Sequence, residues 1–387
     1  MRTLVVTNDF PPRAGGIQTF VASLAVRLPP AEVVVYAPAW PGAPAYDAAL
    51  EFPVVRHPGS LMLPVPSVLR RARQIARTEG CSAVWFGAAA PLGLLADGLR
   101  RSGVRRFVAS THGHEVGWAR VPGGRAALRR IGRDVDVVTY LGDYTRSRLA
   151  PALGPGASLA RLPSGVDTDF FRPAAGGEGV RRAHRLADRP VVVCVSRLVP
   201  RKGQDTLVRA LPEIRRRVPG AALLLVGGGP DSKRLRRLAA ATGVADAVRF
   251  TGPVPWEALP AHYAAGDVFA MPCRTRRAGM DVEGLGIVYL EASAAGLPVV
   301  AGRSGGAPDA VLEGETGHVV DGRAPGEVID RVAGLLADPT KSAAMGERGR
   351  AWVERTWRWD LLAARLRGLL AGTEGEAVSP PQSADRG

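Results

Sequence analysis

The sequence predicts an α/β fold of two doubly wound, Rossmann-like domains that face each other across a cleft. At 387 residues the chain is longer than one hydrophobic core usually supports. Short apolar runs alternate with helical patterns from end to end, which is typical of parallel sheets covered by helices. A segment rich in Pro and Gly at 173–179 separates two such series and is the best linker signal in the chain. In this architecture ligands bind at the carboxyl ends of the strands.

The expected strands fall into two groups of five. Those of the first half are Leu4–Thr7, Val33–Tyr36, Ala83–Phe86, Arg106–Ser110 and Val137–Tyr140. Those of the second half are Val191–Ser196, Ala222–Val226, Val248–Thr251, Val268–Met271 and Pro298–Ala301. Residues 373–387 have the composition of a disordered tail.

Composition narrows the class of protein. Hydrophobic residues make up 46% of the chain, and no run approaches the roughly 18 apolar residues of a membrane-spanning helix. The first residues form a short strand pattern without the features of a signal peptide, so we expect a cytoplasmic protein. The formal net charge of +15 favours phosphates or anionic membranes as partners. Nucleic acid is not expected, because no recognised binding motif accompanies the charge.

The cysteines indicate neither a disulfide framework nor a zinc site. Cys81, Cys194 and Cys273 are scattered and show no C-x-x-C spacing. Cys194 lies within an apolar strand pattern and is interpreted as a small buried side chain.

The most informative segment runs from Glu283 to Glu291. The two carboxylates are separated by a turn containing Gly284 and Gly286, followed by an apolar helix pattern. Such a turn leaves backbone N–H groups free at a helix N-terminus, where anionic or hydroxyl-rich ligands bind. The alternative is that both glutamates only cap or solvate a helix.

Two cations follow the first strand of the second half. Arg197 and Lys202 are placed to stabilise the charge of a pyrophosphate leaving group, one by a bidentate fork and the other as a point charge. The segment therefore suggests transfer of a sugar from a nucleotide-diphosphate donor. A solvated cluster of charges in a loop is the alternative.

Two further segments follow strands of the first half. Gly15 and Gly16 precede an apolar helix and would let the backbone approach a phosphate, although they serve equally well as a tight turn. His112 comes directly after the strand that ends at Ser110, and we expect it to reach the cleft. A zinc site formed with His114 and Glu115 is disfavoured, because such close neighbours would point apart.

These four segments together resemble the retaining glycosyltransferases of family four, which have the two-domain GT-B fold. The signature Glu-x-Leu-Gly, a second Glu eight residues on, and a following Gly-Leu-Pro-Val characterise that group. The segments at 7–13, 111–115, 162–167 and 271–274 are most similar to those of actinobacterial, GDP-mannose-dependent phosphatidylinositol mannoside mannosyltransferases. The likeness extends from Leu4 to about Arg367.

The resemblance implies a role for each residue of the donor site. Arg197 and Lys202 would bind the diphosphate, with Gly15 and Gly16 closing over it. Glu283 would bind the sugar hydroxyls together with the amides of Gly284, Leu285 and Gly286. Glu291 would bind the ribose, Val254 would contact the base, and His112 would lie under the sugar near its C6 hydroxyl. The implied site residues are His112, Arg197, Lys202, Glu283, Gly15, Gly16, Val254, Gly284, Leu285, Gly286 and Glu291.

The resemblance also implies a mechanism without a metal ion or other cofactor. Configuration would be retained by attack on the same face of the sugar, with the leaving phosphate accepting the acceptor's proton. No protein base is then needed, so we expect the two glutamates to bind and position the donor rather than to transfer protons.

The implied domain organisation follows the same family. Residues 1–175 would form an acceptor-binding domain and 188–356 a nucleotide-sugar-binding domain. A helix at 357–371 would return to the first domain, with Trp352, Trp357 and Trp359 packed around the crossing.

The acceptor side is predicted from an arginine-rich helix at 67–77. Arg70, Arg73 and Arg77 share one face, and an apolar loop at 61–66 precedes them. This pattern predicts contact with an anionic membrane surface, and hence a peripheral protein on the inner face of the plasma membrane. A surface helix packed on the first sheet, with its charges in water, is the alternative.

Transfer of mannose from GDP-mannose to a phosphatidylinositol monomannoside glycolipid, in α-1,6 linkage, is the leading hypothesis. Alternatives are a related enzyme with another nucleotide sugar and a soluble acceptor, a nucleotide-sugar-binding protein without catalysis, and a nucleotide-sugar epimerase.

Overall fold

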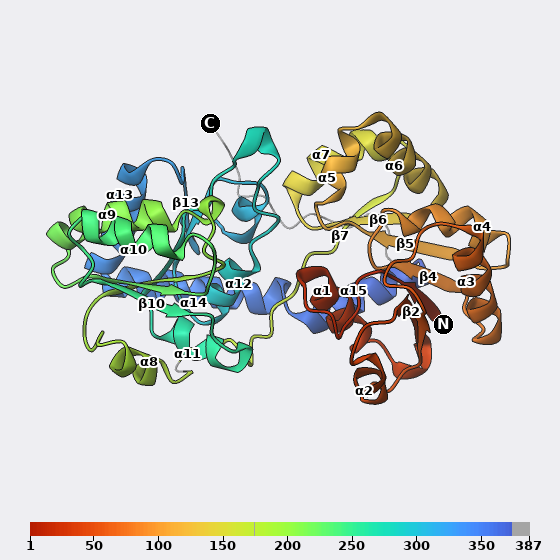
Figure 1. Ribbon diagram of the computed structural model, residues 1–387, viewed down its shortest axis with the longest axis horizontal. Helices are drawn as coiled ribbons and strands as arrows, with labels where there is room; N and C mark the ends of the chain where they lie inside the picture. The colour runs from red at the N-terminus through yellow and green to blue at the C-terminus, as the bar shows by residue number, and fades with distance from the viewer. Residues whose placement is uncertain (174, 374–387) are drawn as a thin grey trace. The chain divides into compact units, whose positions relative to one another are not determined.

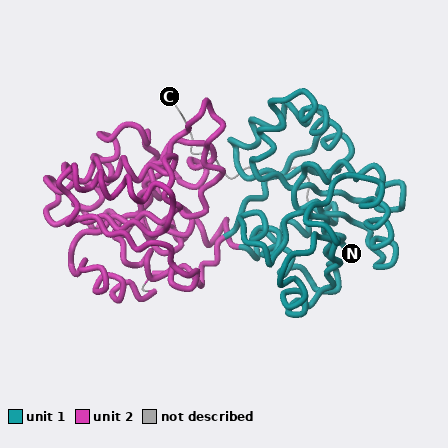
Figure 2. The backbone as a smooth tube through the Cα atoms, in the orientation of Figure 1, with its two compact units in different colours: residues 1–165, 359–387 teal, residues 166–358 magenta. Residues whose placement is uncertain are grey.

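The computed structural model describes residues 1–173 and 175–373. The chain divides into two compact units (Figure 2): residues 1–165 with the segment from 359 onward, and residues 166–358. Each unit is built on one parallel sheet, which confirms the expected α/β class. The expected tail lies, apart from Thr373, outside the described residues.

The first unit contains a seven-stranded parallel sheet in the order β3-β2-β1-β4-β5-β6-β7 (Figure 1). Its strands are β1 (Thr3–Val6), β2 (Val33–Pro38), β3 (Val54–His57), β4 (Ala83–Phe86), β5 (Arg106–Ser110), β6 (Val137–Tyr140) and β7 (Leu159–Arg161). Its helices are α1 (Gly16–Ala25), α2 (Ala43–Ala48), α3 (Pro66–Thr78), α4 (Ala96–Arg100), α5 (Glu115–Ala119), α6 (Pro122–Asp134), α7 (Asp143–Leu153) and α15 (Trp359–Ala371), with 3-10 turns η1 (Pro30–Glu32) and η2 (Leu92–Leu95).

The second unit contains a six-stranded parallel sheet in the order β10-β9-β8-β11-β12-β13. Its strands are β8 (Val191–Val195), β9 (Ala222–Val226), β10 (Val248–Gly252), β11 (Val268–Met271), β12 (Val299–Gly302) and β13 (Gly317–Val320). Its helices are α8 (Gly177–Ala183), α9 (Gln204–Arg217), α10 (Ser232–Ala241), α11 (Leu259–Ala264), α12 (Ile287–Ala294), α13 (Pro325–Ala337) and α14 (Pro339–Thr356), with 3-10 turns η3 (Pro200–Lys202), η4 (Trp256–Ala258), η5 (Arg277–Gly279) and η6 (Ala307–Ala310).

All ten expected strands are present, and three more, β3, β7 and β13, were not predicted. Each of the three lies at the edge of its sheet. A strand at an edge is partly exposed and has no need of a continuous apolar run, as the Val54–His57 strand, with all four residues half-buried, illustrates.

The first unit ends at Gly165, whereas the linker signal placed the boundary near residue 175. Val166 and Phe171 are buried in the core of the second unit, so these residues pack there before the Pro- and Gly-rich segment begins. At the other end, Trp352 and Trp357 pack edge to face in the second core, while Trp359 belongs to the first.

The helix α15 packs into the first unit next to α1. Trp359, Leu362 and Leu366 are buried in the same cluster as Phe20 of α1 and Trp85 of β4. Burying this apolar face holds the C-terminal segment against the N-terminal half of the chain.

Candidate functional site

The segment after β8 carries Arg197 and Lys202. Gln204 fixes its path by donating hydrogen bonds to Ser196 Oγ (2.8 Å) and to the carbonyl O of Arg197 (3.1 Å). Gly203 has φ +79°, and a Cβ there would lie 2.0 Å from the carbonyl O of Pro272, so only glycine fits. The guanidinium of Arg197 is exposed and has no ion-pair partner among the described residues.

Lys202 and Glu283 form a mostly buried ion pair. The Nζ of Lys202 lies 2.7 Å from Oε2 of Glu283, without the alignment of a hydrogen bond, and each residue is less than a tenth exposed. Arg201 stands behind the pair, 3.7 Å from the same carboxylate oxygen. Two residues that the sequence placed in one donor site are therefore in direct contact.

The turn before α12 leaves its amides free. Among the residues that the structure describes, none accepts a hydrogen bond from the backbone N–H of Gly284, Leu285 or Gly286. Gly286 has φ +79° and begins α12 without a side-chain cap. A row of unpaired amides at a helix N-terminus binds anions or hydroxyl oxygens.

A second loop supports this turn from behind. The N–H of Gly306 donates to the carbonyl O of Glu283 (3.0 Å). A Cβ on Gly305 would lie 1.9 Å from that oxygen, and one on Gly306 would lie 2.2 Å from the carbonyl O of Gly284. The close backbone contact fixes the turn, and sequence reasoning missed it because the loop lies about twenty residues further along the chain.

Glu291 is buried in α12 and has one hydrogen-bonding partner that was not predicted. The hydroxyl of Tyr263 donates to its Oε2 at 2.6 Å. Burial raises the pKa of Glu291 to about 7, against the opposing effects of that hydrogen bond and of the charge of Lys202.

In the first unit, His112 follows β5 and is partly buried. Its Nε2 lies 2.6 Å from the carbonyl O of Gly87, which only accepts, so Nε2 carries the proton and Nδ1 of the neutral ring remains an acceptor. Burial lowers the pKa of His112, which favours that neutral ring. The rings of Phe20 and His112 pack edge to face, with their centroids 4.8 Å apart.

The segment after His112 is organised by Glu115. This fully buried carboxylate accepts hydrogen bonds from the backbone N–H of His112 (3.0 Å) and of Gly113 (3.1 Å). Its other oxygen lies 3.4 Å from Nε2 of His114. Within the described residues, no group of three or more His, Cys, Asp or Glu side chains has the arrangement of a metal site.

The remaining predicted residues lie at the start of α1 and in the loop after β10. Gly15 immediately precedes α1, and a Cβ there would lie 2.1 Å from Oε1 of Gln18. Gly16 opens the helix, and a Cβ there would meet nothing within 4 Å. Val254 follows β10 and is half-buried against the core of the second unit.

The arginines of α3 are not equivalent. Arg70 and Arg77 are exposed, as is Arg71, while Arg73 is half-buried and donates to the carbonyl O of Gly98 at 2.9 Å and 3.1 Å. The opposite face is buried through Val68, Ala72, Ile75 and Ala76. Before the helix, Leu61, Leu63 and Val65 are 57%, 48% and 40% exposed. None of the helices described is long and apolar enough to span a membrane.

Two family models match the chain. The model described as Glycosyltransferase Family 4 matches residues 14–170, and that described as Glycosyl transferases group 1 matches residues 179–352.

Curated relatives match over almost their full length. The chain is 59% identical to the GDP-mannose-dependent alpha-(1-6)-phosphatidylinositol monomannoside mannosyltransferase of Mycobacterium tuberculosis, covering 96% of this chain and 99% of the relative. It is 46% identical to the GDP-mannose-dependent monoacylated alpha-(1-6)-phosphatidylinositol monomannoside mannosyltransferase of Corynebacterium glutamicum, covering 95% and 97%.

Solved structures with the same fold have low sequence identity. The Anabaena protein HepE, in complex with UDP, superposes with a TM-score of 0.79 at 19% identity, covering 96% of this chain and all of that one. A sucrose-phosphate synthase from Thermosynechococcus elongatus gives 0.75 at 22% identity, covering 96% and 99%. The family models and the relatives together show that the chain belongs to glycosyltransferase family 4, with the GT-B fold, as its motifs predicted.

Proposed function

We propose that the protein transfers mannose from GDP-mannose to a phosphatidylinositol monomannoside acceptor, in α-1,6 linkage. The observation that carries the proposal is 59% identity over 99% of a relative named for that activity. The free amides of Gly284–Gly286 beside the Lys202–Glu283 pair support it, since they provide donors for sugar hydroxyls or phosphate oxygens.

The proposed donor site divides the nucleotide sugar among residues of the second unit. Arg197 and Lys202 bind the diphosphate and stabilise the charge that develops on GDP as it leaves. Glu283 and the amides of Gly284, Leu285 and Gly286 bind the mannose. Glu291 binds the ribose and Val254 contacts the base. From the first unit, Gly15 and Gly16 approach the diphosphate, and His112 accepts a hydrogen bond from the sugar at Nδ1.

The proposed chemical step retains the configuration at C1 of mannose. The bond between C1 and the β-phosphate oxygen breaks, a bond from C1 to the acceptor oxygen forms, and the acceptor's proton passes to the departing phosphate. Because Lys202 and Arg197 supply the positive charge, we expect transfer to continue in the presence of EDTA.

The decisive assay follows release of GDP and formation of labelled glycolipid. We expect turnover with GDP-mannose only when a phosphatidylinositol monomannoside is supplied, and loss of donor use in Glu283→Ala. Turnover with UDP-glucose but not with GDP-mannose would refute the donor, and turnover with a soluble sugar alone would support the alternative of a soluble acceptor.

We also propose that the protein docks peripherally on the inner membrane face through α3 and its preceding loop. The exposed Leu61, Leu63 and Val65 would enter the interface, while arginines of the helix meet anionic headgroups. The helix prediction used Arg70, Arg73 and Arg77. Because Arg73 donates its hydrogen bonds to the carbonyl O of Gly98, the docking proposal relies on the exposed Arg70, Arg71 and Arg77.

Vesicle sedimentation tests this surface. Each arginine near an anionic surface contributes about 1 kcal/mol, so Arg70→Ser/Arg71→Ser/Arg77→Ser should weaken binding to phosphatidylinositol-containing vesicles by roughly 100-fold. The control removes the same charge from exposed positions of the second unit, Arg237→Ser/Arg331→Ser/Arg355→Ser. Equal losses in both variants would refute a specific docking face.

A further inference from the structure

A cavity of ≈ 540 Å³ in the second unit is lined almost entirely by arginines. Its lining comes from the first turns of α9, from the loop after β11 and from the start of α13, namely Thr206, Arg209, Arg274, Arg276, Arg277, Arg323 and Pro325. We call this set the arginine pocket. It shares no residue with the proposed donor site.

The arginine pocket adjoins the proposed donor site but is lined by different residues, since the backbone N–H of Arg274 donates to the carbonyl O of Arg201 at 2.8 Å. The helices α9 and α13 pack against each other, and the arginine pocket is formed at their N-terminal ends. Glu291 lies on α12, which packs instead against α14. Neither Lys202 nor the amides before α12 line the arginine pocket.

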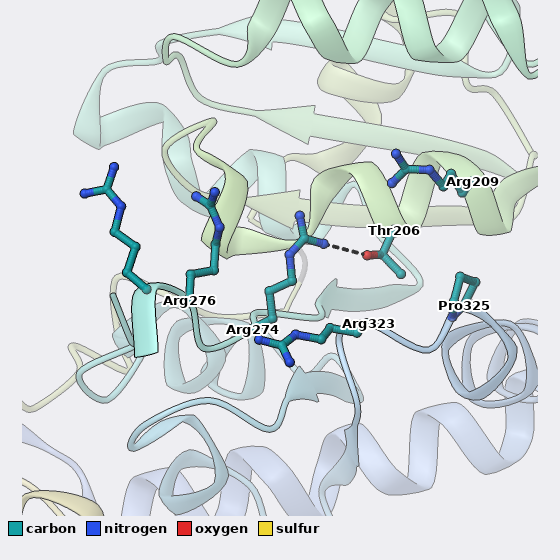
Figure 3. Close-up of a pocket in the computed structure, with 7 residues that line it drawn as sticks. Thr206, Arg209, Arg274, Arg276, Arg323 and Pro325 are labelled. Carbon is teal, nitrogen blue, oxygen red and sulfur yellow. Dashed lines mark hydrogen bonds between the residues drawn. The ribbon is translucent and has the colours of Figure 1, made fainter. Parts of the chain in front are cut away.

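Hydrogen bonds hold the walls of the pocket in place. Arg274 donates to both oxygens of Asp205 (2.8 and 2.9 Å) and to Thr206 Oγ1 (3.0 Å), as Figure 3 shows for the latter. Thr206 in turn donates to the carbonyl O of Gly322 at 2.8 Å. Arg323 donates back to the carbonyl O of Thr275. All three segments of the lining are thus joined.

Positive charge in the pocket exceeds the negative charge around it. Five guanidiniums line the cavity and no carboxylate does. The carboxylate of Asp205 accepts hydrogen bonds from both Arg209 and Arg274. Asp281 is 3.8 Å from Arg276 but is shared with Arg201 at 3.4 Å. Guanidiniums gathered around a cavity without matching carboxylates repel one another unless an anion occupies the space between them.

Arg276 and Arg277 lie at the tip of the loop after β11, where the backbone has an unusual conformation. Arg277 and Ala278 have φ +50° and +51°, a left-handed conformation that residues other than glycine rarely adopt. The tip is closed by backbone hydrogen bonds between Arg276 and Asp281 in both directions (2.9 and 3.2 Å). Within the described part of the chain, Arg277 has no ion-pair partner. Its guanidinium is therefore available to a ligand.

We propose that the arginine pocket is a second anion site that binds a phosphate-bearing ligand separately from the sugar donor. Arginine matches phosphate oxygens with paired N–H donors, and a cavity of this size accommodates more than one phosphate group or a phosphate with its substituent. Arg274 frames the pocket, Arg277 supplies a donor without an ion-pair partner among the described residues, and Arg276 adds a guanidinium whose carboxylate neighbour, Asp281, is shared with Arg201. The chemistry is the same for a soluble phosphate and for the headgroup of a phospholipid.

Titration of the GDP-saturated protein tests the pocket, because GDP keeps the donor site occupied. One arm adds sodium pyrophosphate, followed by calorimetry. The other adds phosphatidylcholine vesicles with and without phosphatidylinositol. The test variant is Arg276→Ser/Arg277→Ser, and the control is Arg236→Ser/Arg237→Ser, a neighbouring pair of exposed arginines on α10.

We expect the wild type and the control pair to bind in at least one arm, and the test variant to lose that binding by 10-fold or more, roughly what two charge-assisted contacts contribute. Loss in the pyrophosphate arm identifies a soluble ligand, and loss confined to the vesicle arm identifies a lipid headgroup. Unchanged binding by the test variant in both arms, or no binding by the wild type in either, overturns the proposal. Arg276→Lys/Arg277→Lys, which keeps the charge, should recover part of the affinity, and circular dichroism checks that each variant is folded.

Discussion

The raised pKa of Glu291 makes the stability of the unliganded protein depend on pH. Burial raises this pKa from 4.5 to about 7, so between these values the folded state binds a proton that the unfolded state has lost. The contribution of Glu291 is therefore fully present below about pH 4.5 and is lost as the pH rises through 7. The loss amounts to about 3 kcal/mol over the whole window.

Glu291→Gln isolates this effect, because the amide has nearly the same shape, still accepts from Tyr263 and does not titrate. Near pH 5 the variant and the wild type should be similarly stable. Near pH 8.5 the variant should be more stable by about 2 kcal/mol, since its buried group carries no charge. Glu347→Gln, at an exposed position of α14, is the matched control.

Urea unfolding at a series of pH values, without nucleotide, measures the difference directly. Parallel pH dependences for wild type and Glu291→Gln would refute the argument. Saturating GDP-mannose adds a second readout. If the ionised carboxylate binds the ribose, donor affinity of the wild type should rise with pH toward a plateau above 7, whereas the weaker affinity of the variant should not. Such a dependence reports on donor affinity, so it is compatible with the expectation that the two glutamates bind and position the donor rather than transfer protons.

Two other changes test the turn and the ion pair. Gly286 has a left-handed conformation, and the Cβ of Gly286→Ala would lie 2.4 Å from Cε2 of the buried Tyr289. This variant should therefore lower the free energy of unfolding by about 2 kcal/mol and weaken GDP-mannose binding in calorimetry. In the control Gly284→Ala, the Cβ meets nothing within 4 Å, so the free energy of unfolding should stay within about 0.5 kcal/mol of the wild type. Lys202→Met removes the nearer cation from the buried Glu283 and leaves only Arg201 at 3.7 Å, so it should cost about 2 kcal/mol in urea unfolding. Lys202→Met/Glu283→Gln should recover most of that loss, and equal losses in both variants would show that the pair is not coupled.

Local sequence signals predicted the central strands and the turn before α12 well, because both are determined by neighbouring residues. Buried parallel strands need continuous apolar runs, and an αL position before a helix needs glycine, as at Gly286. The edge strands β3 and β7 escaped prediction because partial exposure removes that requirement, whereas β13 is mostly buried but begins with Gly317 and His318, which interrupt the apolar run. Val54–His57 mixes apolar and polar residues, so its strand character becomes evident only from its pairing with β2.

The partners of the site residues depend on contacts that sequence spacing does not reveal. Tyr263 is separated from Glu291 by 28 residues, yet its hydroxyl is the hydrogen-bond donor to that buried carboxylate. The two residues lie on α11 and α12, the helices before and after β11. A buried tyrosine near the end of a six-residue helix carries no local pattern that would have indicated its role.

The arginine pocket shows how a functional hypothesis can arise from such distant contacts. The run containing Arg274, Arg276 and Arg277 is visible in the sequence. Arg209 and Arg323 are remote from it, and only the packing of α9 against α13 brings them to the same cavity. Because binding would rest on several charges that have few counterions in the protein, phosphate affinity should fall steeply with salt. Phosphate affinity that did not change with salt concentration would contradict this account of binding by charge.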